Sequence, residues 1–206
     1  MKTAEAKMST KEYINWYMDA MKQSADQIDC GTIEKITDAL FKVWQNAGTV
    51  YLMGNGGSAS NASHIVNDMG KCTVVPGKKR LKVLGFTDNP SLITALVNDN
   101  GFDNLYSEQL LNFVKPGDAL IGFSVHGGSG RDKAGLWSQN LLKAFNVAKE
   151  NGCITIGFSG FDGGAMKEIC DICSIVPFPN TQIVESWHLA LAQLVCNGLL
   201  DKIKNS

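Results

Sequence analysis

The 206-residue sequence lacks the features that mark several classes of protein. It has no excess of one charge, because 19 Lys and Arg stand against 20 Asp and Glu, and the formal net charge is -1. This balance gives no general attraction to nucleic acid or to an anionic membrane. No apolar run approaches the roughly 20 residues that span a bilayer, and the N-terminus lacks the apolar stretch of a signal peptide. We therefore expect a cytoplasmic protein that binds neither nucleic acid nor membranes.

The sequence also lacks the cysteine spacing of a disulfide framework or a zinc ribbon. Its six cysteines are scattered, most of them within apolar segments, which is typical of reduced thiols in a core. Cys170 and Cys173 form a CxxC pair. A zinc ribbon needs a second pair, and a redox pair lies at a helix N-terminus, whereas this pair lies where a helix is predicted to run into a strand. We expect it to be structural.

What the sequence does contain is an alternation of helices and apolar strands. Apolar residues at three-to-four spacing predict two helices within residues 1–47, and Gly48 ends the second. Strands are then predicted near 49–53, 81–86, 118–124, 153–158 and 172–177, each followed by a helical stretch. This order is the signature of a parallel sheet with helices on both faces, and the chain length suits one such domain.

A glycine-rich run from Gly54 to Ala59 follows the first predicted strand and opens a helix. Glycines let backbone N–H groups turn toward a ligand, and the free N–H groups at a helix start attract anions, with Ser58 as a good N-cap. His64 and Asp68 lie four residues apart on this helix, so their side chains share one face. The junction predicts a phosphate and a metal side by side, the alternative being an ordinary strand-to-helix turn.

The run from Ser124 to Gly130 follows another buried strand and carries hydroxyls, the His126 imidazole and flexible backbone. Ligands of an open parallel sheet bind at the carboxyl ends of its strands, so this run is predicted to meet Ser58 at one edge. Small hydroxyls and backbone amides hold a phosphate monoester without Lys or Arg. The alternative is a polar loop that caps a helix, and two such loops at one edge make it less favoured.

These segments, in this order and spacing, resemble the sugar isomerase (SIS) domain family, and within it the phosphoheptose isomerases. The resemblance rests on residues 54–59, His64, the stretches 92–101 and 124–129, the run 160–164 and the last helix. It implies a flavodoxin-like three-layer αβα sandwich with a five-stranded parallel sheet. It also implies a single SIS domain over 1–206, in which the helical pair 1–47 packs in the oligomer and 48–206 forms the αβα core.

The resemblance implies an aldose–ketose isomerase that converts sedoheptulose 7-phosphate to D-glycero-heptose 7-phosphate, or that acts on a related sugar phosphate. It further implies a homotetramer with active sites between subunits, and a divalent metal, zinc in the first place. The competing expectation is a non-catalytic member that binds a sugar phosphate or the bacterial replication initiator. The implied substrate-binding residues are Asn55, Gly56, Gly57, Ser58, Asp99, Ser124, Gly127 and Ser129.

The implied metal positions depart from the family pattern. His64 matches the first ligand, but Asp68 stands where the family has a Glu. On the last helix, the register set by residues 188–189 places Glu185 at the family's Gln and Gln193 at its His. Eight residues turn a helix by about 80°, so Glu185 and Gln193 share a face. We therefore expect His64, Asp68, Glu185 and Gln193 as metal ligands.

Two further departures bear on catalysis. A second register of the last helix leaves Val184 and Ala192 at the ligand positions and would abolish the metal site. His126 stands where the family has a serine, and an insertion over 130–139 follows it. Because the family's catalytic His is missing from the last helix, we expect the His126 imidazole to carry a proton. The expected catalytic residues are Asp68 or Glu185 as the base, with His126 and Gln193.

Overall fold

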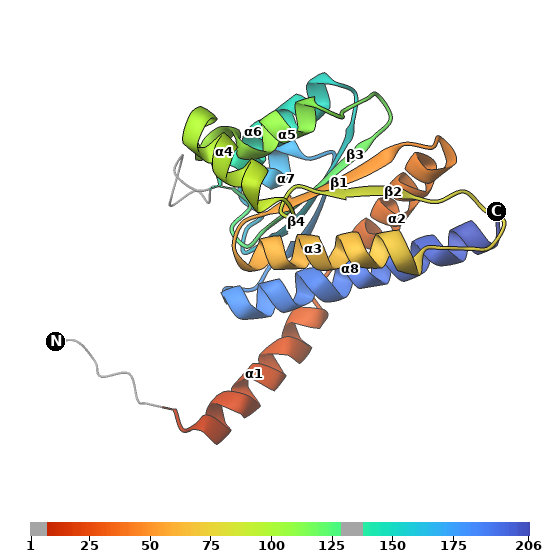
Figure 1. Cartoon of the computed structure of the whole chain (residues 1–206). Coiled ribbons are helices and arrows are strands. Elements are labelled where there is room, and N and C mark those ends of the chain that lie inside the picture. Colours follow the sequence, from red (N-terminus) through yellow and green to blue (C-terminus); the bar gives the residue numbers. More distant parts are fainter. Residues whose placement is uncertain (1–7, 129–137) are drawn as a thin grey trace.

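The computed structural model describes residues 8–128 and 138–206 and shows a five-stranded sheet between two layers of helices (Figure 1). The strands are β1 (Thr49–Gly54), β2 (Lys82–Gly85), β3 (Ala119–Ser124), β4 (Ile154–Gly160) and β5 (Ile172–Val176). All neighbouring strands are parallel, in the order β2-β1-β3-β4-β5. The predicted fold class and the five predicted strands are confirmed, since they form one parallel sheet in flavodoxin-like order.

Helices cover both faces of this sheet. One layer contains α2 (Cys30–Gln45), α3 (Gly57–Cys72) and α8 (Thr181–Lys204), and α1 (Thr10–Ala25) extends from it (Figure 1). The other contains α4 (Pro90–Asn100), the short 3-10 helix η1 (Phe102–Asn104), α5 (Leu105–Leu111), α6 (Gln139–Glu150) and α7 (Met166–Ile169). Side chains alternate along β1, so Leu52 joins one core and Tyr51 the other.

The helix α8 is apolar because it lies in the core. Its length and an 18-residue window of mean hydropathy 1.2 would by themselves suit a membrane span, so the prediction that no segment approaches this threshold was too strict. Nine of its residues are buried, among them Val184, Leu191 and Val195 in the core between α8 and the sheet. Packing in the domain core therefore accounts for its composition.

All six cysteines are free thiols, as expected for a core of reduced cysteines. Burial raises the pKa of Cys153 to about 11 and those of Cys173 and Cys196 to about 12, which keeps these thiols protonated and unreactive. Cys170 directly follows α7 and Cys173 lies in the first residues of β5, so the CxxC pair is where a helix runs into a strand, as the sequence predicts. The sulfur atoms of both cysteines pack against Gly157 of β4, so we assign the pair a packing role.

A buried histidine lies at the centre of α8. His188 has 0% of its surface exposed and packs between Phe123 and Phe158, with ring centroids 6.2 and 6.3 Å away. Among the described residues, neither ring nitrogen has a hydrogen-bond partner of good geometry. Burial lowers the pKa of His188 to about 4, and the nearby Ser159 backbone opposes this only in part. The ring is therefore neutral in the folded protein at physiological pH.

This burial predicts a loss of stability in acid. An unfolded histidine titrates near pH 6.5, so below that pH the unfolded state binds a proton that His188 in the folded state does not bind. The free energy of unfolding should fall by about 3 kcal/mol between pH 6.5 and 4, in excess of the carboxylate contributions. Urea unfolding of the wild type and of His188→Leu at several pH values measures it. Equal slopes for the two proteins would contradict this assignment.

Candidate functional site

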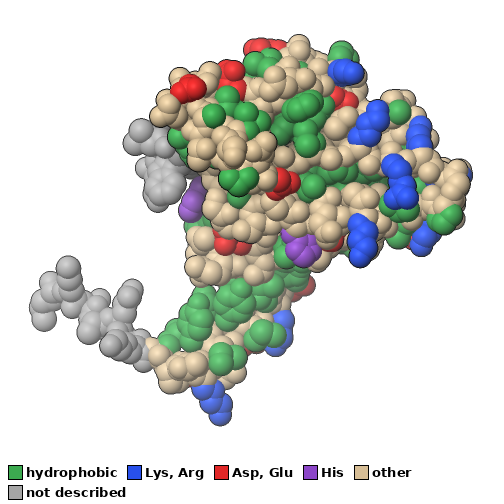
Figure 2. Space-filling view, viewed as in Figure 1, with side chains coloured by type: hydrophobic (Ala, Val, Ile, Leu, Met, Phe, Trp, Pro, Cys, Tyr) green, Lys and Arg blue, Asp and Glu red, His purple; other side chains and the backbone are tan. Residues whose placement is uncertain are grey.

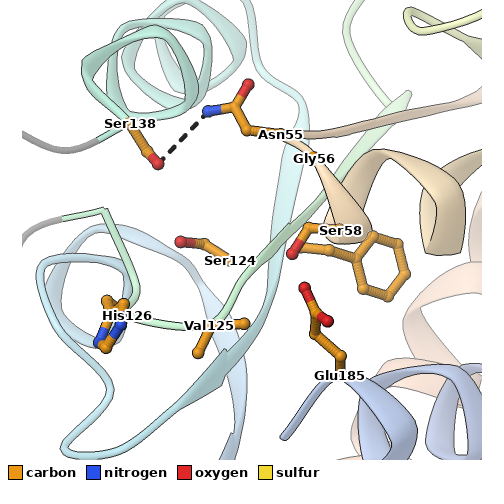
Figure 3. Close-up of a pocket in the computed structure, with 9 residues that line it drawn as sticks. Asn55, Gly56, Ser58, Ser124, Val125, His126, Ser138 and Glu185 are labelled. Atoms are coloured by element: carbon orange, nitrogen blue, oxygen red, sulfur yellow. Dashed lines mark hydrogen bonds between the residues drawn. The ribbon is translucent and has the colours of Figure 1, made fainter. Parts of the chain in front are cut away.

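A pocket of about 250 Å³ lies at the carboxyl ends of β1 and β3 (Figure 3). These two strands are neighbours in space, and the chain leaves them in opposite directions, to β2 on one side and to β4 on the other. In such sheets this switch point is the usual ligand site. The lining comes from the end of β3, the loops that follow β1 and β3, and the starts of α3, α6 and α8: Asn55, Gly56, Ser58, Phe123, Ser124, Val125, His126, Ser138 and Glu185.

Glycines shape the loop between β1 and α3. Gly56 has φ 58° and ψ −124°, a backbone conformation that suits glycine, and it is the N-cap of α3 in place of the predicted Ser58. A Cβ on Gly57 would lie 2.4 Å from Oε1 of Glu185, so the missing side chain makes room for that carboxylate. Ser58 is buried in the first turn of α3, with its hydroxyl at the pocket (Figure 3).

Three hydroxyls from separate segments meet at this pocket. Ser58 and Ser124 were predicted there, and the Gly128 N–H donates to Ser124 Oγ at 3.2 Å. The third is Ser138, the N-cap of α6, whose side chain does not cap its own helix. The sequence predicts Ser129 in this role, and Ser129 lies outside the described residues, as does most of the insertion. The sequence does carry a signal for Ser138, because a serine just before the apolar periodicity of a helix is typical of an N-cap.

An imidazole and a carboxylate line the same pocket. The His126 ring packs on Phe161 with ring centroids 4.4 Å apart, and Phe161 has the left-handed φ of 55°. Glu185 is the carboxylate of this lining within the described residues, and it points toward Ser58 (Figure 3). Gly127 has φ 61°, and its carbonyl accepts from the Met166 N–H, so it shapes the loop that carries His126. The pocket thus combines uncharged hydrogen-bond donors with two side chains that can accept or donate a proton.

A second polar cluster lies farther along α3 and α8. His64 Nε2 is 3.3 Å from Asp68 Oδ2, and the Gln193 amide lies 3.1 Å from His64 Nε2 and 3.3 Å from Asp68 Oδ2. Val184 and Ala192, which the second register would place at ligand positions, are buried in the core. The packing of α8 on α3 therefore supports the register that brings Gln193 to His64.

The four predicted metal ligands do not meet within one chain. Glu185 and Gln193 share a face of α8, but eight residues also separate them by about 12 Å of helical rise, so a shared face does not bring their side chains together. Glu185 therefore reaches Gly57, while Gln193 reaches His64. The described part of the chain contains no group of three or more His, Cys, Asp or Glu suited to a metal ion. Three of the four predicted ligands, His64, Asp68 and Gln193, do lie together in one chain, and Glu185 lies apart from them.

Two of the other predicted substrate residues have different surroundings. Asp99 is exposed on α4, where its Oδ1 accepts from Asn98 Nδ2 at 2.6 Å, and it does not line this pocket. Asn55 does line the pocket, but its amide pairs with that of the buried Asn140, at 2.9 and 3.0 Å. Asn140 was not foreseen, because 85 residues separate it from Asn55 in the sequence.

Comparison with known proteins gives consistent matches. The family model described as SIS domain matches residues 12–160. The chain is 36% identical over 177 residues to a phosphoheptose isomerase of Burkholderia pseudomallei, covering 86% of this chain and 84% of that protein. It is 40% identical over 161 residues to the lincomycin biosynthesis protein LmbN of Streptomyces lincolnensis, but spans only 58% of LmbN. The structure matches phosphoheptose isomerase GmhA from Neisseria gonorrhoeae with a TM-score of 0.81 and 26% identity, covering 94% and 98% of the two chains.

Proposed function

This chain belongs to the SIS domain family, and we propose that it is a phosphosugar isomerase that interconverts a ketose phosphate and an aldose phosphate. The observation that carries the proposal is one pocket in which three serine hydroxyls lie beside a carboxylate and an imidazole. Sedoheptulose 7-phosphate is the first candidate substrate, because relatives with 34–36% identity over most of their length are phosphoheptose isomerases. D-glycero-heptose 7-phosphate would be its aldose product.

The phosphate is assigned to the serine side of the pocket. Ser58, Ser124 and Ser138 offer hydroxyl donors, and α3 and α6 both begin there, so the N-terminal ends of these two helices add partial positive charge. No Lys or Arg lines the pocket within the described residues. Many neutral donors therefore replace an ion pair in binding the dianion.

The proton transfers are assigned to the carboxylate and the imidazole of the lining, Glu185 and His126. Glu185 removes the proton from the carbon next to the carbonyl, which gives an enediol, and then returns a proton to the neighbouring carbon. His126 moves a proton between the two oxygens of the enediol, so that the substrate neither gains nor loses atoms overall. Asp68 and Gln193, also expected to be catalytic, pair with His64 in the second cluster and receive no step in this scheme.

A panel of C5 to C7 ketose and aldose phosphates, followed by NMR with and without added divalent metal, tests this function. We expect turnover of at least one member, with sedoheptulose 7-phosphate in first place. Binding of sugar phosphates without turnover of any member would instead favour the non-catalytic alternative. Elemental analysis of the same preparation measures whether a divalent metal is bound. The metal stays a prediction from the family resemblance, and none of the proton transfers assigned here involves it.

We also propose that the chain assembles with copies of itself, a homotetramer being the form that the family resemblance implies. The helix α1 extends from the body and presents apolar side chains along its surface (Figures 1 and 2). Its large exposed apolar residues are Tyr13, Ile14, Trp16 and Met18, with exposed fractions between 36% and 55%, and Met8 just before the helix is also exposed. An apolar surface of this kind on a projecting helix is typical of an interface between chains.

Ile14→Glu is expected to break this assembly. Ile14 is 55% exposed, so a charge there costs the single chain little but would be buried unpaired between copies. Light scattering after gel filtration should show a multiple of 22.3 kDa for the wild type and a smaller mass for the variant. Lys11→Glu, on an exposed polar position of α1, is the control and should keep the wild-type mass. A wild-type mass of one chain would contradict the proposal.

A further inference from the structure

The side-chain amide of Asn55 is fully hydrogen-bonded within the protein. Its Oδ1 accepts from Asn140 Nδ2 at 2.9 Å and from the Tyr106 hydroxyl at 3.3 Å. Its Nδ2 donates to Asn140 Oδ1 at 3.0 Å and to Ser138 Oγ at 3.3 Å (Figure 3). An amide offers two hydrogens and two lone pairs. These four contacts use all of them, which leaves the Asn55 side chain nothing for a sugar hydroxyl.

The orientation of this amide pair is set by the backbone. Rotating both amides by 180° would preserve the two hydrogen bonds between Asn55 and Asn140, so the pair alone does not decide where each nitrogen lies. The Leu141 N–H donates to Asn140 Oδ1 at 3.0 Å, and an N–H cannot accept. Asn140 therefore presents its Nδ2 to Asn55 Oδ1. The Nδ2 of Asn55 is thereby directed to Ser138.

Burial makes this arrangement rigid. Asn140 is 0% exposed and Tyr106 is 3% exposed, so breaking their hydrogen bonds would leave polar groups unpaired in the core. Burial also raises the pKa of Tyr106 to about 12, so its hydroxyl stays protonated. Its single hydrogen lies nearer the Gly54 carbonyl than Asn55 Oδ1, so Asn140 Nδ2 is the main fixed donor to Asn55 Oδ1.

The fixed orientation of the Asn55 amide determines how the Ser138 hydroxyl can hydrogen-bond. Its oxygen accepts from Asn55 Nδ2, and its side chain does not cap α6. A serine hydroxyl has a single hydrogen. We propose that Asn140 is a positioning residue which acts through Asn55 to hold Ser138 as a hydrogen-bond donor toward the phosphate of the substrate. This inference rests on the proposed function, because it assigns the phosphate to the serine side of the pocket.

A double-mutant cycle on Asn140 and Ser138 tests the inference, with inorganic phosphate as the probe and calorimetry as the readout. In Asn140→Asp both carboxylate oxygens accept, so the side chain has no N–H for Asn55 Oδ1 and accepts equally well from either orientation of the Asn55 amide. The Asn55 amide is then no longer held with its Nδ2 toward Ser138, and where its oxygen faces Ser138 it takes the serine hydrogen away from the phosphate. Asn140→Asp and Ser138→Ala should each weaken phosphate binding roughly ten- to a hundredfold.

The coupling separates this role from a structural one or from simple charge repulsion. In the Ser138→Ala background, Asn140→Asp should weaken binding by no more than about threefold, because the hydroxyl that it redirects is gone. An equal loss in both backgrounds would overturn the inference. Asn140→Ala in the same cycle adds no charge and should show coupling of the same sign. Asn112→Asp, an exposed amide whose Nδ2 donates to the Glu108 carbonyl, is the matched control and should bind phosphate like the wild type.

The outcomes also separate this inference from the proposed function. A wild-type protein that does not bind phosphate would reject both the phosphate site and the role of Asn140. Phosphate binding with additive effects of the two substitutions would reject the role of Asn140 alone. Phosphate binding with coupling, but without turnover of any sugar phosphate, would uphold the role of Asn140 and reject the isomerase activity.

Discussion

Glu185→Gln is expected to lower kcat for a ketose phosphate by roughly a hundred- to ten-thousandfold, the usual contribution of a general base. Glutamine has nearly the same shape and still fits beside Gly57, but it cannot accept the proton from carbon. Phosphate binding should stay unchanged or tighten slightly, because one negative charge leaves the pocket. Initial rates from a coupled assay or from NMR, together with the phosphate Kd, measure both effects.

Asp68→Asn is the matched control, since it removes the same charge from the neighbouring cluster. Asp68 contacts Gln193 and His64 and does not line the pocket that holds Glu185. We expect its kcat to fall by less than about tenfold. A larger loss in Asp68→Asn than in Glu185→Gln would place the reacting carbons at the His64 cluster. The assignment of the base to Glu185 would then be wrong.

Gly127→Ala should have the largest effect on stability. A Cβ at Gly127 would lie 2.0 Å from the Gly163 carbonyl oxygen and 2.5 Å from Ser159 Oγ, and the φ of 61° strains any other residue. We expect a loss of about 2–4 kcal/mol in the free energy of unfolding, and a Tm lower by about 5–15 °C. Differential scanning calorimetry measures both quantities.

A second glycine provides the control for this substitution. Gly70 lies within α3, and nothing stands within 4 Å of a Cβ built there. Gly70→Ala should therefore leave stability unchanged or raise it by up to about 1 kcal/mol, because alanine favours the helix. If Gly127→Ala unfolded at the wild-type temperature, the loop that carries His126 would not depend on this close contact.

The sheet and the position of the site could be predicted from sequence because their signals are local. Continuous apolar runs such as 119–123 and 154–158 read as strands buried on both faces, and the loops that follow them must meet at one sheet edge. Ser58, Ser124 and His126 lie at the pocket for this reason. Strand ends and the helix N-cap were less accurate, since hydrogen bonding decides them residue by residue.

The rest of the site depends on contacts that no local pattern contains. Ser138 reaches the pocket only because α6 begins there, and the preceding insertion hides its correspondence with the shorter family loop. The pairing of Asn55 with Asn140 joins two segments 85 residues apart. Glu185 and Gln193 were predicted to share one metal site from the family correspondence and from helical rotation, whereas the rise along α8 sends them to separate clusters within one chain. Periodicity predicts on which face of a helix a residue lies, but the packing of the helices decides which residues it contacts.

The most direct measurement is NMR of sedoheptulose 7-phosphate incubated with the purified wild-type protein in D₂O, with Glu185→Gln alongside. The account predicts anomeric signals of an aldose 7-phosphate that grow with wild-type enzyme, deuterium at the carbon where the proton is exchanged, and no measurable product from the variant on the same timescale. Equal product from the wild type and from Glu185→Gln would contradict the assigned chemistry. No aldose from sedoheptulose 7-phosphate or from any C5 to C7 analogue, despite binding of the phosphate, would contradict the isomerase activity itself.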